Sequence, residues 1–120
     1  MTQRDANLNG KSSSKVLRFG DATETLSTAK GTTFLELFRH GSLMIEIWKP
    51  EGVDTQQPHV QDELYFVVHG EGEFVHGNQR DHVGAGDVLF VAAQLPHRFE
   101  SFSADFVVWV VFYVPNGGER

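Results

Sequence analysis

Short apolar segments separated by turn-forming residues constrain the fold of this chain more than any other feature. Glycine, proline, asparagine or aspartate falls between most of these segments, and we find no stretch of ten or more residues with helical periodicity and caps. Short strands at such intervals are typical of an all-β sandwich or barrel with little helix. The expected strands lie at 33–39, 42–49, 64–68, 73–75, 88–91, 97–101 and 106–113.

The chain of 120 residues is long enough for one domain with its own core. Residues 1–15 are polar and are expected to form a disordered arm, because they offer almost no apolar surface to bury. We expect the barrel to span residues 16–115 and a flexible tail to follow at 116–120. Near the start of the barrel, the pattern allows one strand around 16–19.

Two connections in the chain are marked by their residue types. The two-residue link His40-Gly41 predicts a hairpin between its flanking strands. Residues 78–81 are polar and are expected to be a connection, with His82 beside it. His40, His69 and His76 each precede a glycine and are therefore expected at turns.

Composition and charge exclude several classes of protein. The chain has no cysteine, so disulfides and thiolate ligands are excluded and any metal must be held by nitrogen and oxygen donors. Its net charge is −6 without a cluster of Lys or Arg, which argues against nucleic acid and anionic membranes as partners. The N-terminus lacks the apolar centre of a signal peptide, and no apolar run approaches the roughly 18 residues of a membrane helix. We therefore expect a cytoplasmic protein.

The candidate metal ligands are Gln57, His59, Glu63 and His97. In an extended strand without a bulge, Gln57, His59, Glu63 and Tyr65 would all point to the same side. His97, delivered by a later strand, would complete a set of two imidazoles and one carboxylate, with Gln57 as a possible fourth donor. Such a set suits a redox-active or Lewis-acidic divalent ion such as iron, manganese, nickel or zinc.

Each candidate also has an ordinary structural explanation. His59 could be a solvent-exposed loop residue, His97 a turn residue, and Glu63 a surface residue with a charged neighbour. The apolar run that follows Glu63 favours its inward position, whereas Asp62, with the opposite alternation, is expected on the surface. Tyr65 could orient a substrate or donate a proton, or could be a core tyrosine whose hydroxyl is satisfied.

Two sequence motifs resemble those of the cupin superfamily. Glu63, six further residues and Gly70 match the end of the first cupin motif, and Gly86-Asp87 followed by Pro96-His97 resembles the second. The chain is thus similar to a small single-domain cupin over roughly residues 32–114. The resemblance implies an all-β double-stranded β-helix, the jelly-roll barrel, with His59, Glu63 and His97 as metal ligands.

One position departs from the first motif. Gln57 stands where the motif has its first histidine. An amide oxygen is a weaker donor than imidazole, so three alternatives remain open. Gln57 could coordinate the metal through its oxygen, could bind a metal-bound water, or could mark a pocket that has lost its metal.

The resemblance implies two alternative functions. One is a metal-dependent enzyme of dioxygenase, isomerase or lyase type that acts on a small molecule, with Glu63 as ligand or base and Tyr65 assisting. The other is a non-catalytic module that binds or senses a small ligand, with or without metal. The segment 106–113 is apolar on both faces, which predicts a homodimer that covers its outer face.

Overall fold

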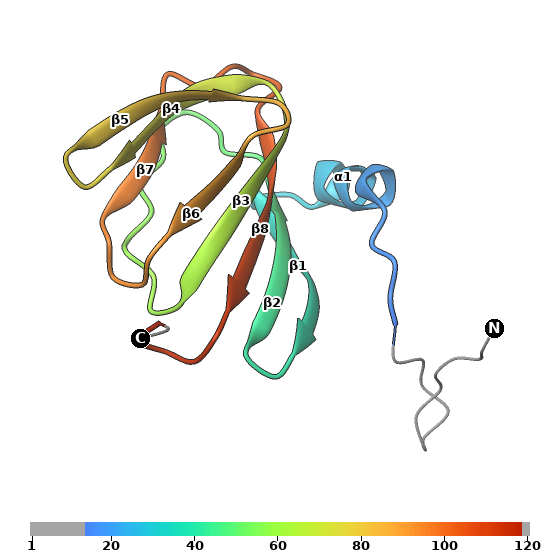
Figure 1. The fold of residues 1–120 in the computed structure, drawn as a ribbon. Coiled ribbons are helices and arrows are strands. Elements are labelled where there is room, and N and C mark those ends of the chain that lie inside the picture. The colour runs from blue at the N-terminus through green and yellow to red at the C-terminus, as the bar shows by residue number, and fades with distance from the viewer. Residues whose placement is uncertain (1–13, 119–120) are drawn as a thin grey trace.

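The computed structural model describes residues 14–118 (Figure 1). Most of the expected N-terminal arm, residues 1–13, and the last two residues of the expected tail lie outside the described part. The elements in chain order are α1 (Phe19–Thr28), β1 (Phe34–His40), β2 (Leu43–Trp48), β3 (Asp62–His69), β4 (Glu71–His76), β5 (Gln79–Gly84), β6 (Val88–Val91), β7 (His97–Glu100) and β8 (Val107–Tyr113). Within the described residues, no helix is long and apolar enough to cross a membrane.

Two antiparallel sheets face each other and form the barrel (Figure 1). The larger sheet has the strand order β1-β2-β8-β3-β6, and the smaller one has the order β5-β4-β7. The predicted hairpin between β1 and β2 is present, with His40 paired to Leu43. The prediction of an all-β jelly-roll barrel is confirmed.

The main core fills the space between the two sheets. In β8 the alternate residues Val108, Val110 and Phe112 are buried inward, as the two-residue period of a strand requires. The aromatic rings of the core meet edge to face, for example Tyr65 and Phe99 at 5.0 Å between ring centroids. The buried members of this core are Tyr65, Val67, Phe74, Val83, Val91, Phe99, Phe106, Val108, Val110 and Phe112.

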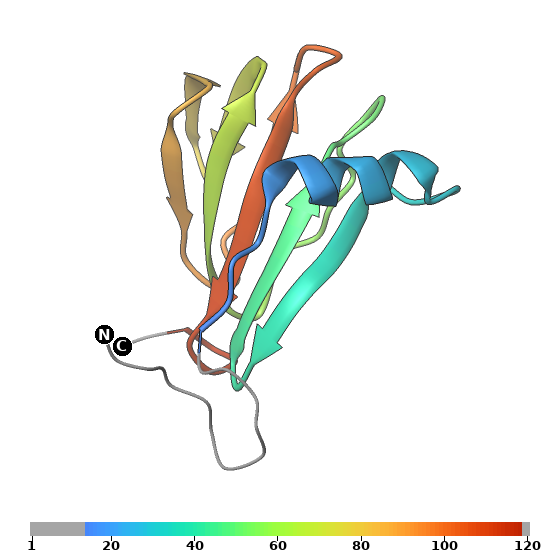
Figure 2. The ribbon, with the colours of Figure 1, turned by 90° about the vertical axis from the view of Figure 1, so that its right-hand side faces the viewer.

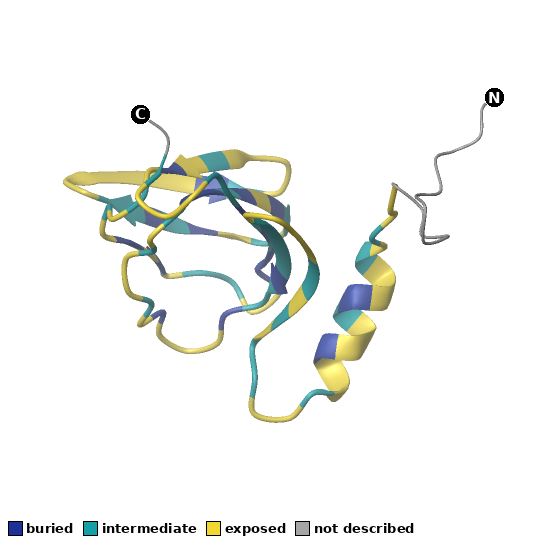
Figure 3. Cartoon of the chain, turned by 90° about the horizontal axis from the view of Figure 1, so that it is seen from below, coloured by how far each residue is buried: buried dark blue, intermediate teal, exposed yellow. Residues whose placement is uncertain are grey.

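Helix α1 lies across the outer face of β1, β2 and β8 (Figure 2). The predicted strand around residues 16–19 is therefore wrong, and the missed helix has a short apolar period. Phe19, Ala22 and Leu26 are spaced by three and four residues, which places them on one side of a helix. Figure 3 shows the two buried positions of α1 on its sheet-facing side. A helix of ten residues is marginal alone, so packing against the sheet stabilises it.

This helix also explains why β8 is apolar on both faces. The outward residues Val107 and Trp109 belong to a second cluster beneath α1, where Phe19 contacts Trp109 at 6.0 Å between ring centroids. The face of β8 that we expected a second copy to cover is therefore partly covered by the chain itself. Dimerisation stays a prediction, but this strand alone does not require it.

Strand β5 corrects the expectation of a polar connection at residues 78–81. Its first four residues are polar and exposed, and only Val83 is buried in the core. Because β5 is at the edge of the smaller sheet, most of its residues are polar, and its sequence lacks the apolar alternation that identifies a strand. Cross-strand charge pairs hold it, since the two ring nitrogens of His82 each lie 2.8 Å from a carboxylate, of Glu71 and of Glu73.

Gly70 joins the two sheets where a side chain does not fit. Its φ is 82°, and a Cβ atom there would lie 2.6 Å from the Cα atom of Phe106. Gly86 has a similar φ of 93° but has open space around it. Substitutions at the two glycines therefore distinguish the free-energy cost of a left-handed backbone, present at both, from the cost of a steric clash, present only at Gly70.

We expect Gly70→Ala to lower the free energy of unfolding by about 3 kcal/mol or more, because strain and clash add. Gly86→Ala should cost only the backbone strain, about 1–2 kcal/mol. Urea denaturation of both variants measures the difference. Equal losses would show that the backbone near Phe106 moves aside without cost.

Candidate metal centre

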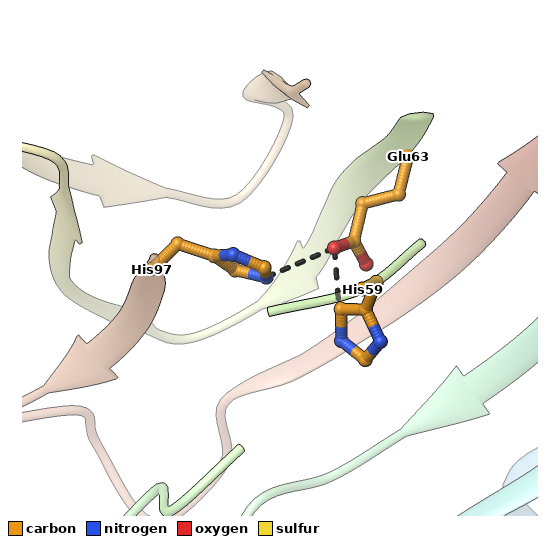
Figure 4. Close-up of side chains that lie close together, drawn as sticks. All are labelled: His59, Glu63 and His97. Atoms are coloured by element: carbon orange, nitrogen blue, oxygen red, sulfur yellow. Dashed lines mark ion pairs between the residues drawn. The ribbon is translucent and has the colours of Figure 1, made fainter. Parts of the chain in front are cut away.

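Three side chains converge inside the barrel from separate segments (Figure 4). Glu63 points inward from β3 and His97 from the first position of β7, while His59 comes from the loop before β3. The carboxylate Oε1 of Glu63 lies 2.9 Å from Nε2 of His97 and 3.8 Å from Nε2 of His59. One potential ligand atom from each residue lies within 4.8 Å of the other two.

The carboxylate of Glu63 is buried and poorly satisfied by protein groups. Glu63 is 1% exposed, and neither of its oxygens accepts a hydrogen bond of normal geometry from any residue in the described part of the chain. A buried carboxylate without such partners is costly unless a cation compensates it. The environment of Glu63 therefore fits a bound metal ion.

His97 is held in the orientation of a metal-binding imidazole. Its Nδ1 lies 2.8 Å from the carbonyl oxygen of Leu95, and because a carbonyl can only accept, Nδ1 carries the proton. In the neutral ring Nε2 then carries the lone pair that can bind a metal ion, and it faces Glu63. Burial lowers the pKa of His97, but contacts with Glu63 and the Leu95 carbonyl outweigh burial and raise this pKa above its ordinary value.

Gln57 is not part of this cluster. It is exposed and does not line the cavity beside Glu63, because strand alternation begins only at Asp62 and the preceding residues form an irregular loop. Its neighbour Gln56 lies at the site instead. The Oε1 atom of Gln56 accepts hydrogen bonds from Nε2 of His59, at 3.0 Å, and from the hydroxyl of Tyr65, at 3.1 Å. No sequence signal distinguishes these adjacent glutamines, since the loop conformation decides between them.

Asp54 fixes the orientation of Gln56. The buried carboxylate of Asp54 accepts hydrogen bonds from the side-chain amide of Gln56, at 2.6 Å, and from the backbone N–H of Phe99, at 2.8 Å. A carboxylate at neutral pH only accepts, so the amide nitrogen of Gln56 must face Asp54 and its oxygen must face the site. Asp54 thus ties the loop to β7 and orients Gln56 at the same time. No sequence pattern indicated this role of Asp54.

Tyr65 is buried beside the cluster as a neutral group. Its hydroxyl lies 3.1 Å from Nε2 of His97 as well as near Gln56. Burial, followed by the charge of Glu63, raises the pKa of Tyr65 well above its ordinary value. Tyr65 can therefore donate a hydrogen bond or a proton but does not act as a phenolate.

Asp62 corrects one expectation from strand alternation. It was expected on the surface, but it is 5% exposed and its carboxylate accepts the backbone N–H of Ala93 at 2.8 Å. The reason is its position at the start of β3, where the turn between β6 and β7 covers that end of the strand.

Comparison with known proteins identifies the family. The model of the cupin domain family matches residues 44–113. The chain belongs to the cupin family. An uncharacterized protein of Streptomyces coelicolor is 33% identical over 98 residues, which cover 80% of this chain and 93% of the relative.

Solved structures of low identity share the fold. A cupin-2 domain protein of Shewanella frigidimarina has a TM-score of 0.62 and 15% identity, covering 80% of this chain and 92% of the other. HppE, solved with Fe(II) and the alternative substrate (S)-1-HPP, has a TM-score of 0.54 and 20% identity, covering 67% of this chain and 48% of the other. The expected membership of the cupin superfamily is confirmed.

A cavity of about 580 Å³ opens beside the His59, Glu63 and His97 cluster of this cupin. Glu63, His59 and Tyr65 lie on its wall together with apolar side chains such as Trp48 and Phe112. A volume of this size is typical of pockets that bind small molecules.

Glu46 adds a second carboxylate to this cavity. It lies on β2 with Met44 and Trp48 on the inner face, while Ile47 points outward beneath α1. Burial first, and then the charges of Glu63 and Glu36, raise the pKa of Glu46 to about 7. The alternation of β2 could have identified Glu46 as an inward residue, had the inner face of that strand been known.

The raised pKa makes the stability of the cupin depend on pH through Glu46. Between pH 4.5, the ordinary pKa, and about 7 the folded state keeps a proton that the unfolded state releases, so stability falls as pH rises through this window. We expect Glu46→Gln to be more stable than the parent protein above the window and equally stable below it. Urea denaturation across this range in the presence of EDTA measures the effect. The exposed Glu24→Gln is the control, and parallel curves for Glu46→Gln and the parent would contradict the expectation.

Proposed function

We propose that this cupin is a metal-dependent enzyme that acts on a small molecule bound in the cavity. The observation that carries the proposal is the buried carboxylate of Glu63, which lies between two imidazoles and accepts no hydrogen bond of normal geometry from the described residues. His59, Glu63 and His97 would hold the divalent ion. Two imidazoles and one carboxylate form the set that non-haem iron enzymes use.

The spacing of the donor atoms supports this assignment. Metal–ligand bonds of about 2.1 Å at right angles place neighbouring donor atoms roughly 3 Å apart. The 2.9 Å between Glu63 and His97 meets this value, and the 3.8 Å to His59 requires only a small movement of a half-exposed loop residue. The presence of Fe(II) in HppE, a protein of the same fold, supports a metal in a barrel of this kind.

When bound, the ion would supply Lewis acidity or, if it is redox-active, electron transfer. The residues of the chain would bind the substrate and supply a proton. Tyr65 holds a proton on its phenol oxygen at the edge of the cluster and can give it, or a hydrogen bond, to a bound substrate. Trp48 and Phe112 give part of the cavity an apolar wall that would exclude water. Because Glu63 would serve as a ligand, the role of base would fall to another group.

One observation favours the alternative, a ligand-binding module without metal. Nε2 of His59 donates a hydrogen bond to Gln56, whose orientation is fixed by Asp54. This contact occupies the nitrogen of His59 that faces Glu63. If Gln56 keeps this hydrogen bond, the cavity would bind its ligand through the protein alone.

Metal retention tests the proposal. The protein is reconstituted separately with iron, manganese, nickel and zinc, desalted, and measured by inductively coupled plasma mass spectrometry. We expect one of these ions to be retained near one equivalent, and His97→Ala and Glu63→Gln to lose it. Gln57→Ala, on the exposed neighbour of Gln56, should retain it.

Circular dichroism shows that each variant is folded before its metal is counted. If the folded parent protein retains none of the four ions, the metal site is excluded and the ligand-binding module becomes the better function. If Gln57→Ala loses the metal as His97→Ala does, Gln57 and not Gln56 is the glutamine that acts at the site.

We further propose a second copy of the chain as a partner. Beyond α1, the outer face of the larger sheet carries apolar pairs across β3 and β6, Leu64 with Phe90 and Phe66 with Val88. Phe90 is 55% exposed and Val88 58% exposed, on a strand at the edge of the sheet. Exposed apolar surface at a sheet edge is typical of an interface.

The expected homodimer is tested by light scattering at tens of micromolar protein. The parent protein should have the mass of a dimer, and Phe90→Glu should be a monomer because it places a charge in the apolar surface. Val16→Glu, which changes an exposed valine near α1, should remain a dimer. A monomeric parent protein would exclude this partner.

A further inference from the structure

The cavity presents acidic groups and lacks a basic side chain. Its lining includes Glu46, Glu51, Asp54 and Glu63, and no lysine or arginine belongs to the described residues that form it. His59 also lies on its wall, and its Nε2 atom is hydrogen-bonded to Oε1 of Gln56. A carboxylate or phosphate ligand would meet repulsion in this part of the cavity and would find no basic partner.

Three of these four acidic groups are otherwise accounted for. Asp54 accepts hydrogen bonds from Gln56 and Phe99, and Glu63 belongs to the metal cluster. Glu51 is exposed to solvent at the rim. Glu46 remains as the half-buried carboxylate that faces the cavity without an assigned role.

Glu46 lacks a partner within the described protein. Neither a hydrogen bond nor an ion pair joins it to another described residue, and its cross-strand neighbour on β1 is a second acid, Glu36. The nearby cation, Arg39, is bound to Glu36 through two hydrogen bonds of 3.0 Å each. Arg39 acts on Glu46 only through its charge, which is the smallest of the influences on the pKa of Glu46. A half-buried carboxylate in this position therefore favours a cation supplied from outside.

Aromatic and apolar side chains flank Glu46 on the same inner surface. Met44 and Trp48 lie two residues before and after it on β2, and Val110 faces it from β8. Phe112 pairs with Met44, and it lines the cavity together with Trp48. Aromatic faces attract organic cations, and a carboxylate beside them supplies the charge that binds an ammonium group.

We propose that Glu46 binds a protonated amine, and that the cavity selects small organic amines with an apolar or aromatic body over carboxylates and phosphates. The inference rests on the proposed function only in that it takes the cavity as the ligand site. The binding of the amine does not depend on the metal, because an ion at Glu63 leaves Glu46 without a partner, whereas the selection against carboxylates and phosphates is proposed for the metal-free cavity. In the proposed enzyme the amine would be the end of the substrate that lies away from the metal cluster.

Three probes with the same ring body separate charge from shape. Benzylamine, benzyl alcohol and benzoate are titrated into metal-free protein, in EDTA at about pH 8, where Glu46 is ionised and the amine is protonated. Binding is followed by NMR of 15N-labelled protein through the indole N–H of Trp48, assigned with Trp48→Phe. We expect benzylamine to bind about tenfold tighter than benzyl alcohol, and benzoate to bind more weakly than either.

Two variants locate the selectivity. Glu46→Gln should bind benzylamine no better than benzyl alcohol, while its affinity for benzyl alcohol stays the same. Glu51→Gln removes the same charge from the exposed rim and should keep the preference for the amine. The unchanged affinity for benzyl alcohol shows that Glu46→Gln keeps the shape of the cavity.

Selectivity retained in Glu46→Gln, equal binding of benzoate and benzylamine, or no binding of any probe overturns the inference. Metal retention is measured separately, so the two proposals fail separately. A protein that retains metal but does not prefer the amine loses only this inference. A protein that prefers the amine but retains no metal loses only the metal centre.

Discussion

Glu63 carries a carboxylate into the interior of the barrel, and the rest of the site is arranged around that charge. The side chain is 1% exposed, and its oxygens accept no hydrogen bond of normal geometry within the described chain. Its field contributes to the raised pKa values of Tyr65, His97 and Glu46. An interior charge of this kind lowers stability unless a cation accompanies it, which relates the fold of this cupin to the candidate metal centre.

The loop between β2 and β3 is the second organising element. It has no regular structure, yet Asp54 binds it to the backbone of Phe99 on β7 and to Gln56. These hydrogen bonds place Gln56 against His59 and Tyr65. The site is thus built from two sheets and a loop, and of the three clustered residues only Glu63 lies within the interior of a strand.

The larger sheet is covered differently on its two faces. Its inner face forms the main core and the cavity, whereas α1 covers part of its outer face over Ile47 and Val107. Leu64, Phe66 and the edge strand β6 lie outside that cover. The helix therefore provides one partner for the outer face, and a second copy is proposed for the remainder.

Local sequence patterns predicted the strands whose residues alternate or are wholly apolar, because the two-residue period of a strand is a local property. The spacing of the motif residues likewise predicted His59, Glu63 and His97. Tertiary contacts fixed the elements whose local signal is weak. The short apolar period of α1 forms a helix because it packs against the sheet, and the polar β5 forms a strand because it pairs with β4. Tertiary structure also decided between Gln56 and Gln57, since an irregular loop has no period, and hydrogen bonds from Asp54 to distant residues set its conformation. The acidic character of the cavity likewise depends on the tertiary structure, because the inward position of Glu46 on β2 brings it into the same cavity as Glu63.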